Sequence, residues 1–156
     1  MRYQQSLWRR MLTFISSLAA LSLLGCTGGD GVPLFPAQGK LTVAGLPAEG
    51  ALVTLVPEAG TEPDVRPAGR VDATGVFNIQ TYDPDTHSTK EGARPGVYVA
   101  LVTWVPDPTD SNLEMGVRDR LGNRYRNRES SKFRFEIKEG APALAPIDLP
   151  KTDLAY

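Results

Sequence analysis

The stretch of residues 96–105 most constrains the fold, because a strand formed there would be apolar on both faces. Alternate side chains fall into two sets, which are Val97, Val99, Leu101 and Val105 with Thr103 on one side, and Tyr98, Ala100, Val102 and Trp104 on the other. A strand with two apolar faces is usually covered on both sides. The pattern therefore predicts a central strand, and the rest of the chain must supply the layers that cover it.

Short runs separated by turn residues predict that these layers are also made of strands. The sequence has 15 glycines and 13 prolines, and several of the runs between them alternate apolar and polar residues. The turns are predicted at residues 44–47 and 72–75, and no run has convincing helical periodicity. The predicted strands are 39–43, 51–56, 69–71, 76–81, 96–105, 132–138 and 146–149. About seven short strands predict an all-β fold, a single antiparallel β-sandwich.

The first 25 residues have the pattern of a secretory signal. Arg2, Arg9 and Arg10 make the start positive, and residues 11–24 form an apolar run that ends at the small residue Gly25. Fourteen residues are short of the ~20 that a spanning helix needs. Cleavage after residue 25 of the 156 leaves 131 residues. It removes three of the 17 basic residues and none of the 18 acidic ones, so the mature net charge becomes −4.

The residues around the predicted cleavage site resemble the lipobox of bacterial lipoprotein precursors. The matching residues are Leu23, Leu24, Gly25 and Cys26, although Leu24 is bulkier than the small residue usual at its position. The resemblance implies that the Cys26 thiol carries a lipid anchor, with palmitate-type acyl chains, and that the protein resides in the cell envelope, facing the periplasm or the surface. Thr27 is not the aspartate that the enterobacterial sorting rule associates with retention in the inner membrane, which favours the outer membrane. Cys26 is the only cysteine, so no disulfide is expected.

The body of the chain resembles the carboxypeptidase-regulatory-like, transthyretin-like β-sandwich. The resemblance rests on residues 39–43 followed by 47–53, on 69–77 with its Asp72–Gly75 turn, and on Pro95-Gly96-Val97-Tyr98-Val99. With the lipobox, this one domain is similar to small lipoproteins of planctomycete-type bacteria, in which Tyr125 and Ser130-Ser131 would match the closing segment. The resemblance implies a domain at 39–150 after a flexible linker at 26–38, with a tail at 151–156. It implies no catalytic residue, because the named carboxypeptidases carry their catalysis in another domain.

An arginine-rich segment is the main candidate for binding. Seven basic residues lie within 17 positions, opposed only by Asp119 and Glu129, and they are Arg118, Arg120, Arg124, Arg126, Arg128, Lys132 and Arg134. The first five predict a patch for anionic lipid or acidic polysaccharide. The alternative is a solvated loop whose arginines pair with acids elsewhere, since the mature chain is net acidic.

Other clusters of polar and aromatic residues have simpler structural interpretations. Asp83, Asp85, His87 and Glu91 could hold a divalent cation, but the glycine and terminal glutamate of a calcium loop are missing, so a solvated loop is expected instead. His87 is the only histidine and no glycine-flanked nucleophile is present, so no catalytic triad is predicted. Four aromatic residues could stack on sugars or lie in the core, namely Tyr82, Tyr98, Trp104 and Tyr125; the core is favoured for Tyr98 and Trp104.

Together these observations predict a non-enzymatic, lipid-anchored binding or structural module of the envelope. Two alternatives remain open, which are a carbohydrate-binding accessory module and an enzyme of unrecognised type. No catalytic residue, metal site or cofactor is predicted. The charge balance gives no nucleic-acid signature, so the expected partners are the membrane through Cys26 and an anionic lipid or polysaccharide.

Overall fold

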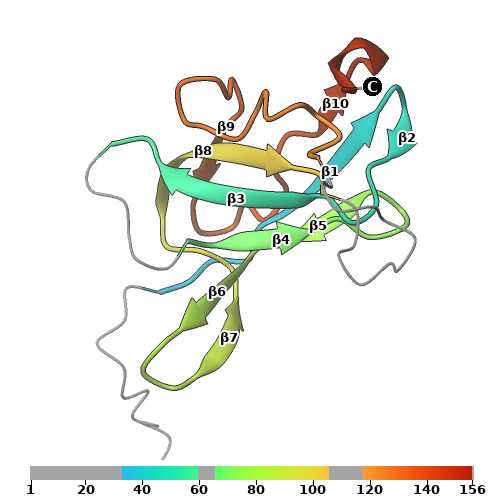
Figure 1. The fold of residues 1–156 in the computed structure, drawn as a ribbon. Coiled ribbons are helices and arrows are strands. Elements are labelled where there is room, and N and C mark those ends of the chain that lie inside the picture. The colour runs from blue at the N-terminus through green and yellow to red at the C-terminus, as the bar shows by residue number, and fades with distance from the viewer. Residues whose placement is uncertain (1–32, 60–65, 106–117, 156) are drawn as a thin grey trace, which may run out of the picture. The chain divides into compact units, whose positions relative to one another are not determined.

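The chain folds as two β-sheets, and the longest strand lies inside the larger one. The computed structural model describes residues 33–59, 66–105 and 118–155, so Cys26 and the predicted signal lie outside the described residues. Strand β8 (Gly96–Thr103) pairs antiparallel with β3 (Leu52–Pro57) on one side and with β9 (Arg134–Ile137) on the other. The prediction that residues 96–105 form an internal strand is confirmed (Figure 1).

The larger sheet has six strands, in the order β7-β6-β4-β3-β8-β9. Strand β4 (Ala68–Arg70) pairs with β3 and with β6 (Gln80–Asp83), and β6 pairs in turn with β7 (Ser88–Glu91). No strand was predicted between residues 82 and 94, and a solvated loop was expected at Asp83, Asp85, His87 and Glu91. That prediction is wrong, because β6 and β7 form a regular antiparallel hairpin that extends from the sheet (Figure 1).

The smaller sheet is built around β1 (Gln38–Val43). Strand β5 (Val76–Asn78) pairs antiparallel with residues 38–40, and β2 (Leu46–Pro47) pairs with Thr42 and Val43. Strand β10 (Ile147–Leu149) runs parallel to residues 41–43 at the edge of the sheet. The described residues thus hold ten strands rather than about seven, and the sheets are antiparallel except at β1–β10. The only regular helix in these residues is one 3₁₀ turn, Lys151–Asp153.

The chain passes from one sheet to the other at Ile79. Residues 76–78 pair with β1 in the smaller sheet, whereas residues 80–83 pair with β4 and β7 in the larger one. At the junction the Ile79 N–H donates to the Ala37 carbonyl, and the Gly92 N–H donates to the Ile79 carbonyl. The expected single strand at 76–81 is therefore two strands, although Phe77 and Ile79 are buried as predicted.

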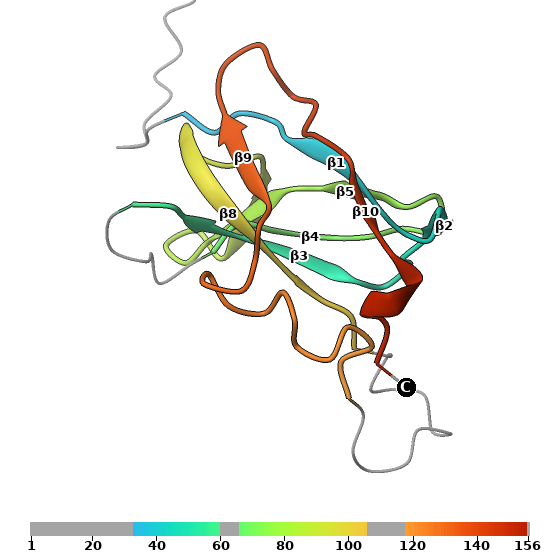
Figure 2. The same cartoon turned by 90° about the horizontal axis from the view of Figure 1, so that it is seen from above.

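Most of the core lies between the two sheets, which face each other in Figure 2. The smaller sheet contributes Leu41, Val43, Phe77, Ile147 and Leu149, and the larger contributes Val53, Leu55, Tyr98, Ala100, Val102, Phe135 and Ile137. A second, smaller cluster of Val56, Val99 and Leu101 lies on the other face of β3 and β8. The predicted alternation along β8 is therefore confirmed, because neighbouring residues of this strand enter different clusters.

Tight turns join the strands where the sequence places glycine. Ala44 and Gly45 both have positive φ, 52° and 78°, as a two-residue hairpin turn between β1 and β2 requires. Leu46 and Pro47, expected within the turn, instead form β2 and pair with Val43 and Thr42. At the 72–75 turn, the Asp72 carboxylate accepts hydrogen bonds from the Thr74 hydroxyl and from the Val76 N–H. These bonds lower the pKa of Asp72.

Both ends of the described chain are attached to the fold. Phe35 exchanges backbone hydrogen bonds with Ala93, and Ala37 is buried, so the packed domain begins before the boundary predicted at residue 39. At the other end, the Ala155 N–H donates to the Arg120 carbonyl, so the predicted tail also packs. No helix in the described ranges is long and apolar enough to cross a membrane.

Candidate binding groove

The arginine-rich loop, defined here as residues 118–131, is tied along its length to the end of β8. The Arg120 N–H donates to the Trp104 carbonyl at 2.8 Å, and the Val102 N–H donates to the Tyr125 carbonyl at 3.0 Å. Ser131 closes the loop, since its buried hydroxyl donates to the Ala100 carbonyl at 2.5 Å. The loop follows β8 without forming a strand. The N–H groups of Gly122, Arg124, Arg126 and Ser131 are instead bonded within local turns.

A buried carboxylate organises the first half of this loop. Asp119 is only 6% exposed. Its Oδ1 accepts the N–H groups of Trp104 at 2.9 Å and Leu121 at 3.0 Å, and its Oδ2 accepts the Asn123 N–H at 3.2 Å. The sequence shows Asp119 as one of two acids among the arginines, yet its described bonds are to backbone groups. It fixes the path of the loop rather than neutralising a neighbour.

Two apolar side chains anchor the loop in the core. Leu121 is fully buried, and Tyr125 is 6% exposed with its ring centroid 5.2 Å from that of Phe133. The Tyr125 hydroxyl donates to the Asp153 carboxylate in the C-terminal turn. Burial, followed by this bond and the negative charge of Asp153, raises the pKa of Tyr125 to about 12.

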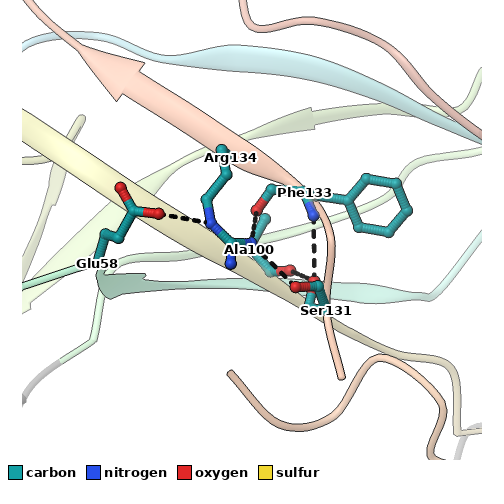
Figure 3. A network of polar contacts seen from close by, with 5 residues as sticks. All are labelled: Glu58, Ala100, Ser131, Phe133 and Arg134. Atoms are coloured by element: carbon teal, nitrogen blue, oxygen red, sulfur yellow. Dashed lines mark hydrogen bonds and ion pairs between the residues drawn. The ribbon is translucent and has the colours of Figure 1, made fainter. Parts of the chain in front are cut away.

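The predicted cationic residues therefore have different environments. Arg118, Arg120, Arg124 and Arg126 are exposed, and Arg128 is half-buried. Arg134 is already bonded to other residues of the fold (Figure 3). Its Nε donates to the Glu58 carboxylate at 2.7 Å, and its Nη1 donates to the Ser131 carbonyl at 2.9 Å. The first four are therefore accessible to solvent, whereas Arg134 is already bonded within the fold.

One of these arginines reaches a groove at the end of the molecule. The groove has a volume of about 510 Å³ and is lined by Val43, Leu46, Pro47, Glu49, Trp104, Arg120 and Leu154. The β1–β2 hairpin supplies the apolar wall, and Leu46 on it is 70% exposed. Its size lies within the about 300–1,000 Å³ typical of ligand sites.

Trp104 and Arg120 form the polar side of the groove. The indole Nε1–H donates to the Glu49 carbonyl at 2.9 Å, which fixes the ring against the turn before β3. The Arg120 guanidinium carbon lies 4.9 Å from the centroid of that ring, within the ~6 Å of a cation–π contact. The groove therefore presents an aromatic ring, a cation, a carboxylate and an apolar wall together.

The cluster weighed as a metal site is used inside the β6–β7 hairpin. Asp83 pairs with Lys90 at 2.7 Å and accepts the Asp85 N–H at 3.1 Å, while His87 Nδ1 lies 3.1 Å from the Tyr82 hydroxyl. Lys90, followed by Thr86, lowers the pKa of Asp83 well below its usual range. Among the described residues, no three potential metal ligands of the His, Cys, Asp and Glu types are grouped to hold an ion.

The four aromatic residues do not form a common platform. Tyr98 and Tyr125 are buried, Tyr82 is 45% exposed on the hairpin, and Trp104 is half-buried at the groove. Sequence reasoning favoured the core for Trp104, and it missed Glu49 and Leu46 altogether. No local pattern marks those two residues, because the groove exists only once β2 and the arginine-rich loop reach the same end of the fold.

Comparison with protein-family models, with curated proteins and with solved structures finds no match for this chain.

Proposed function

We propose that this chain is a lipid-anchored protein of the cell envelope, whose two sheets form an immunoglobulin-like or transthyretin-like sandwich that binds a ligand without catalysis. The sequence from Leu23 to Cys26 carries the proposal for the anchor. The groove beside Trp104 and Arg120 supports a binding role, because it gathers ligand-binding chemistry at an exposed surface. Neither argument requires a catalytic residue, metal or cofactor.

The anchor is tested by changing Cys26 to Ser. Stable attachment requires two or more acyl chains, and all of them depend on processing at this thiol, so the variant should lose radiolabelled palmitate and leave the membrane fraction or accumulate as precursor. Thr27→Ala, which keeps the cysteine, is the matched control and should remain acylated. Mature Cys26→Ser protein that stays membrane-bound would contradict the proposal. Density-gradient separation of the two membranes tests the outer-membrane assignment based on Thr27.

A second candidate is a carbohydrate-binding accessory module. The observation that favours it is the meeting of Trp104 and Arg120 in one groove, because aromatic rings pack on the C–H faces of sugars while charged side chains bond their hydroxyls. Retention of the protein on polysaccharides from its own envelope tests this candidate. Retention that is unchanged in Trp104→Phe and Arg120→Gln would place the binding elsewhere.

A further inference from the structure

The Arg120 guanidinium is held in place by the fold, and the described residues leave its N–H donors available to a ligand. Its backbone is fixed on both sides, by the bond from its N–H to Trp104 and by the bond from Ala155 to its carbonyl. Its side chain stacks on the Trp104 ring. Within the described part of the chain, no hydrogen bond or ion pair uses its five N–H groups. An arginine fixed in this way loses little further freedom when it binds a planar anion through two parallel hydrogen bonds.

The Glu49 side chain complements this donor. It is exposed and lines the same groove, and within the residues that the structure describes it has no ion pair or hydrogen-bond donor. A carboxylate of this kind accepts hydrogen bonds from hydroxyl groups. A negative charge placed directly against it is unfavourable, so an anionic group of a ligand fits beside Arg120 and the hydroxyls fit beside Glu49. The groove is therefore suited to a ligand that is rich in hydroxyls and also carries carboxylates.

The walls of the groove indicate the shape of that ligand. Leu46, Pro47 and the Trp104 ring offer apolar contact to C–H groups, and such contact with a ring is compatible with hydroxyls pointing outward. Beyond the groove, the exposed Arg118, Arg124 and Arg126 continue the positive charge along the loop. A chain of sugar rings with spaced carboxylates offers C–H groups to the apolar walls, hydroxyls to Glu49 and negative charge to the arginines. A flat anionic bilayer would meet the exposed arginines without entering the groove.

We infer that the groove binds a carboxylated polysaccharide of the uronic-acid type. Arg120 bonds the carboxylate, Glu49 accepts the hydroxyls, and Trp104 with Leu46 and Pro47 packs against the sugar ring. This inference rests on the proposed binding function and names its ligand class. It does not depend on the Cys26 anchor, which has its own test.

The test measures binding of the domain, residues 32–156, to polygalacturonate. This unit is suitable because it is compact and has its own core. The matched probes are methyl-esterified polygalacturonate, which lacks the charge, and dextran, which is neutral. We expect polygalacturonate to bind and the other two to bind at least about tenfold more weakly, the factor that corresponds to ~1.4 kcal/mol.

Two arginine variants separate the groove from general charge. Arg120→Gln should weaken binding about tenfold, because it removes a charge-assisted pair of hydrogen bonds. Arg126→Gln has the same change of charge on the same loop but does not line the groove, so it should weaken binding much less. Glu49→Ala should also weaken binding, since it removes the acceptor for hydroxyls. Unchanged thermal midpoints and near-ultraviolet spectra show that each variant is folded.

Three results would overturn the inference. One is no binding to polygalacturonate at low salt. Another is an equal loss in Arg120→Gln and Arg126→Gln, which would indicate a dispersed electrostatic surface. The third is binding to phosphatidylglycerol vesicles that exceeds binding to polygalacturonate and persists in Arg120→Gln, which would indicate a membrane surface. In each case the palmitate-labelling result for Cys26→Ser would still stand on its own.

Discussion

The β6–β7 hairpin and the arginine-rich loop are both polar in sequence, yet they are stabilised in different ways. In the hairpin, the central carboxylate Asp83 is bonded at the surface to Lys90 and to turn N–H groups. In the loop, the central carboxylate Asp119 is buried, and among the described residues its bonds are all to backbone N–H groups. The hairpin has a regular ladder of backbone bonds, whereas the loop has none.

This difference shows which segment depends on individual side chains. A ladder spreads its stability over many backbone bonds, so no single residue of the hairpin should be essential. The loop relies on Asp119, Leu121 and Tyr125, which replace the ladder with buried contacts. Because the loop also forms one side of the groove, its rigidity determines where Arg120 lies.

The strongest test of the comparison replaces the two carboxylates. Asp119→Ala should cause the largest loss of stability, because it leaves the buried N–H group of Leu121 and the partly buried N–H groups of Trp104 and Asn123 without their acceptor. An unsatisfied buried donor costs ~1–3 kcal/mol. Asp83→Ala should change the thermal midpoint little, since water replaces its bonds. Chemical unfolding of both variants measures the contrast. Equal losses would show that the surface carboxylate matters as much as the buried one.

Truncation of one apolar side chain in each segment gives the next largest effect. Leu121→Ala should lower the free energy of unfolding by about 2–5 kcal/mol, because Leu121 is fully buried. Tyr82→Ala in the hairpin should cost much less, since Tyr82 is 45% exposed and its hydroxyl contacts only His87 among the described residues. Denaturant titrations measure both losses of unfolding free energy, and the two losses can be compared if the dependence on denaturant concentration is the same in both variants. A small loss for Leu121→Ala would mean that the loop can repack.

The sequence predicted which side chains of a strand are buried better than it predicted which strands pair. Alternation placed Phe77 and Ile79 in the core correctly, because the period of two depends only on local backbone geometry. It could not show that the chain changes sheets at Ile79, since that depends on distant Ala37 and Gly92. The β6–β7 hairpin was missed for another reason. Its residues are polar on both faces, so it has no hydrophobic pattern to detect.

The candidate site was only partly predictable, for a related reason. Arg120 was visible from the density of arginine in the sequence, and Trp104 from its aromatic side chain. Glu49 belongs to a turn that has no distinctive sequence pattern. It lies beside Trp104 because the Trp104 indole N–H donates to the Glu49 carbonyl. Asp119 was visible only as an acid among bases, although burial makes it the organiser of the loop. Such roles arise from tertiary contacts between segments far apart in the chain.

A smaller effect is expected from pH through Tyr125. Its pKa of about 12 in the folded protein exceeds the ordinary value near ~10, so the unfolded chain loses this proton more readily. The resulting stability is fully present below pH ~10 and is lost as the pH rises through about 12. The decline of the free energy of unfolding with pH, between the unfolded and folded pKa values, should be less steep in Tyr125→Phe but unchanged in Tyr82→Phe. Tyrosinate absorbance measures the titration, and a Tyr125 pKa near ~10 would contradict the buried contact with Asp153.

The smallest expected effect concerns the ion pair of the hairpin. Lys90 is the main cause of the lowered pKa of Asp83, so Lys90→Met should raise that pKa toward its ordinary value, as carboxyl NMR titration would show. Lys138→Met is the control, because Lys138 pairs with Glu136 instead. A lowered carboxyl pKa adds stability that is present above pH ~4 and is lost as the pH falls below it. Here that contribution should be hardly measurable, because both groups are solvated. It should be smaller still in 1 M salt, which shortens the screening length to ~3 Å.

The outcome that would contradict this expectation is a Lys90→Met variant whose thermal midpoint falls as far as that of Asp119→Ala. The hairpin would then also depend on a single side chain, and the contrast between the two segments would be lost.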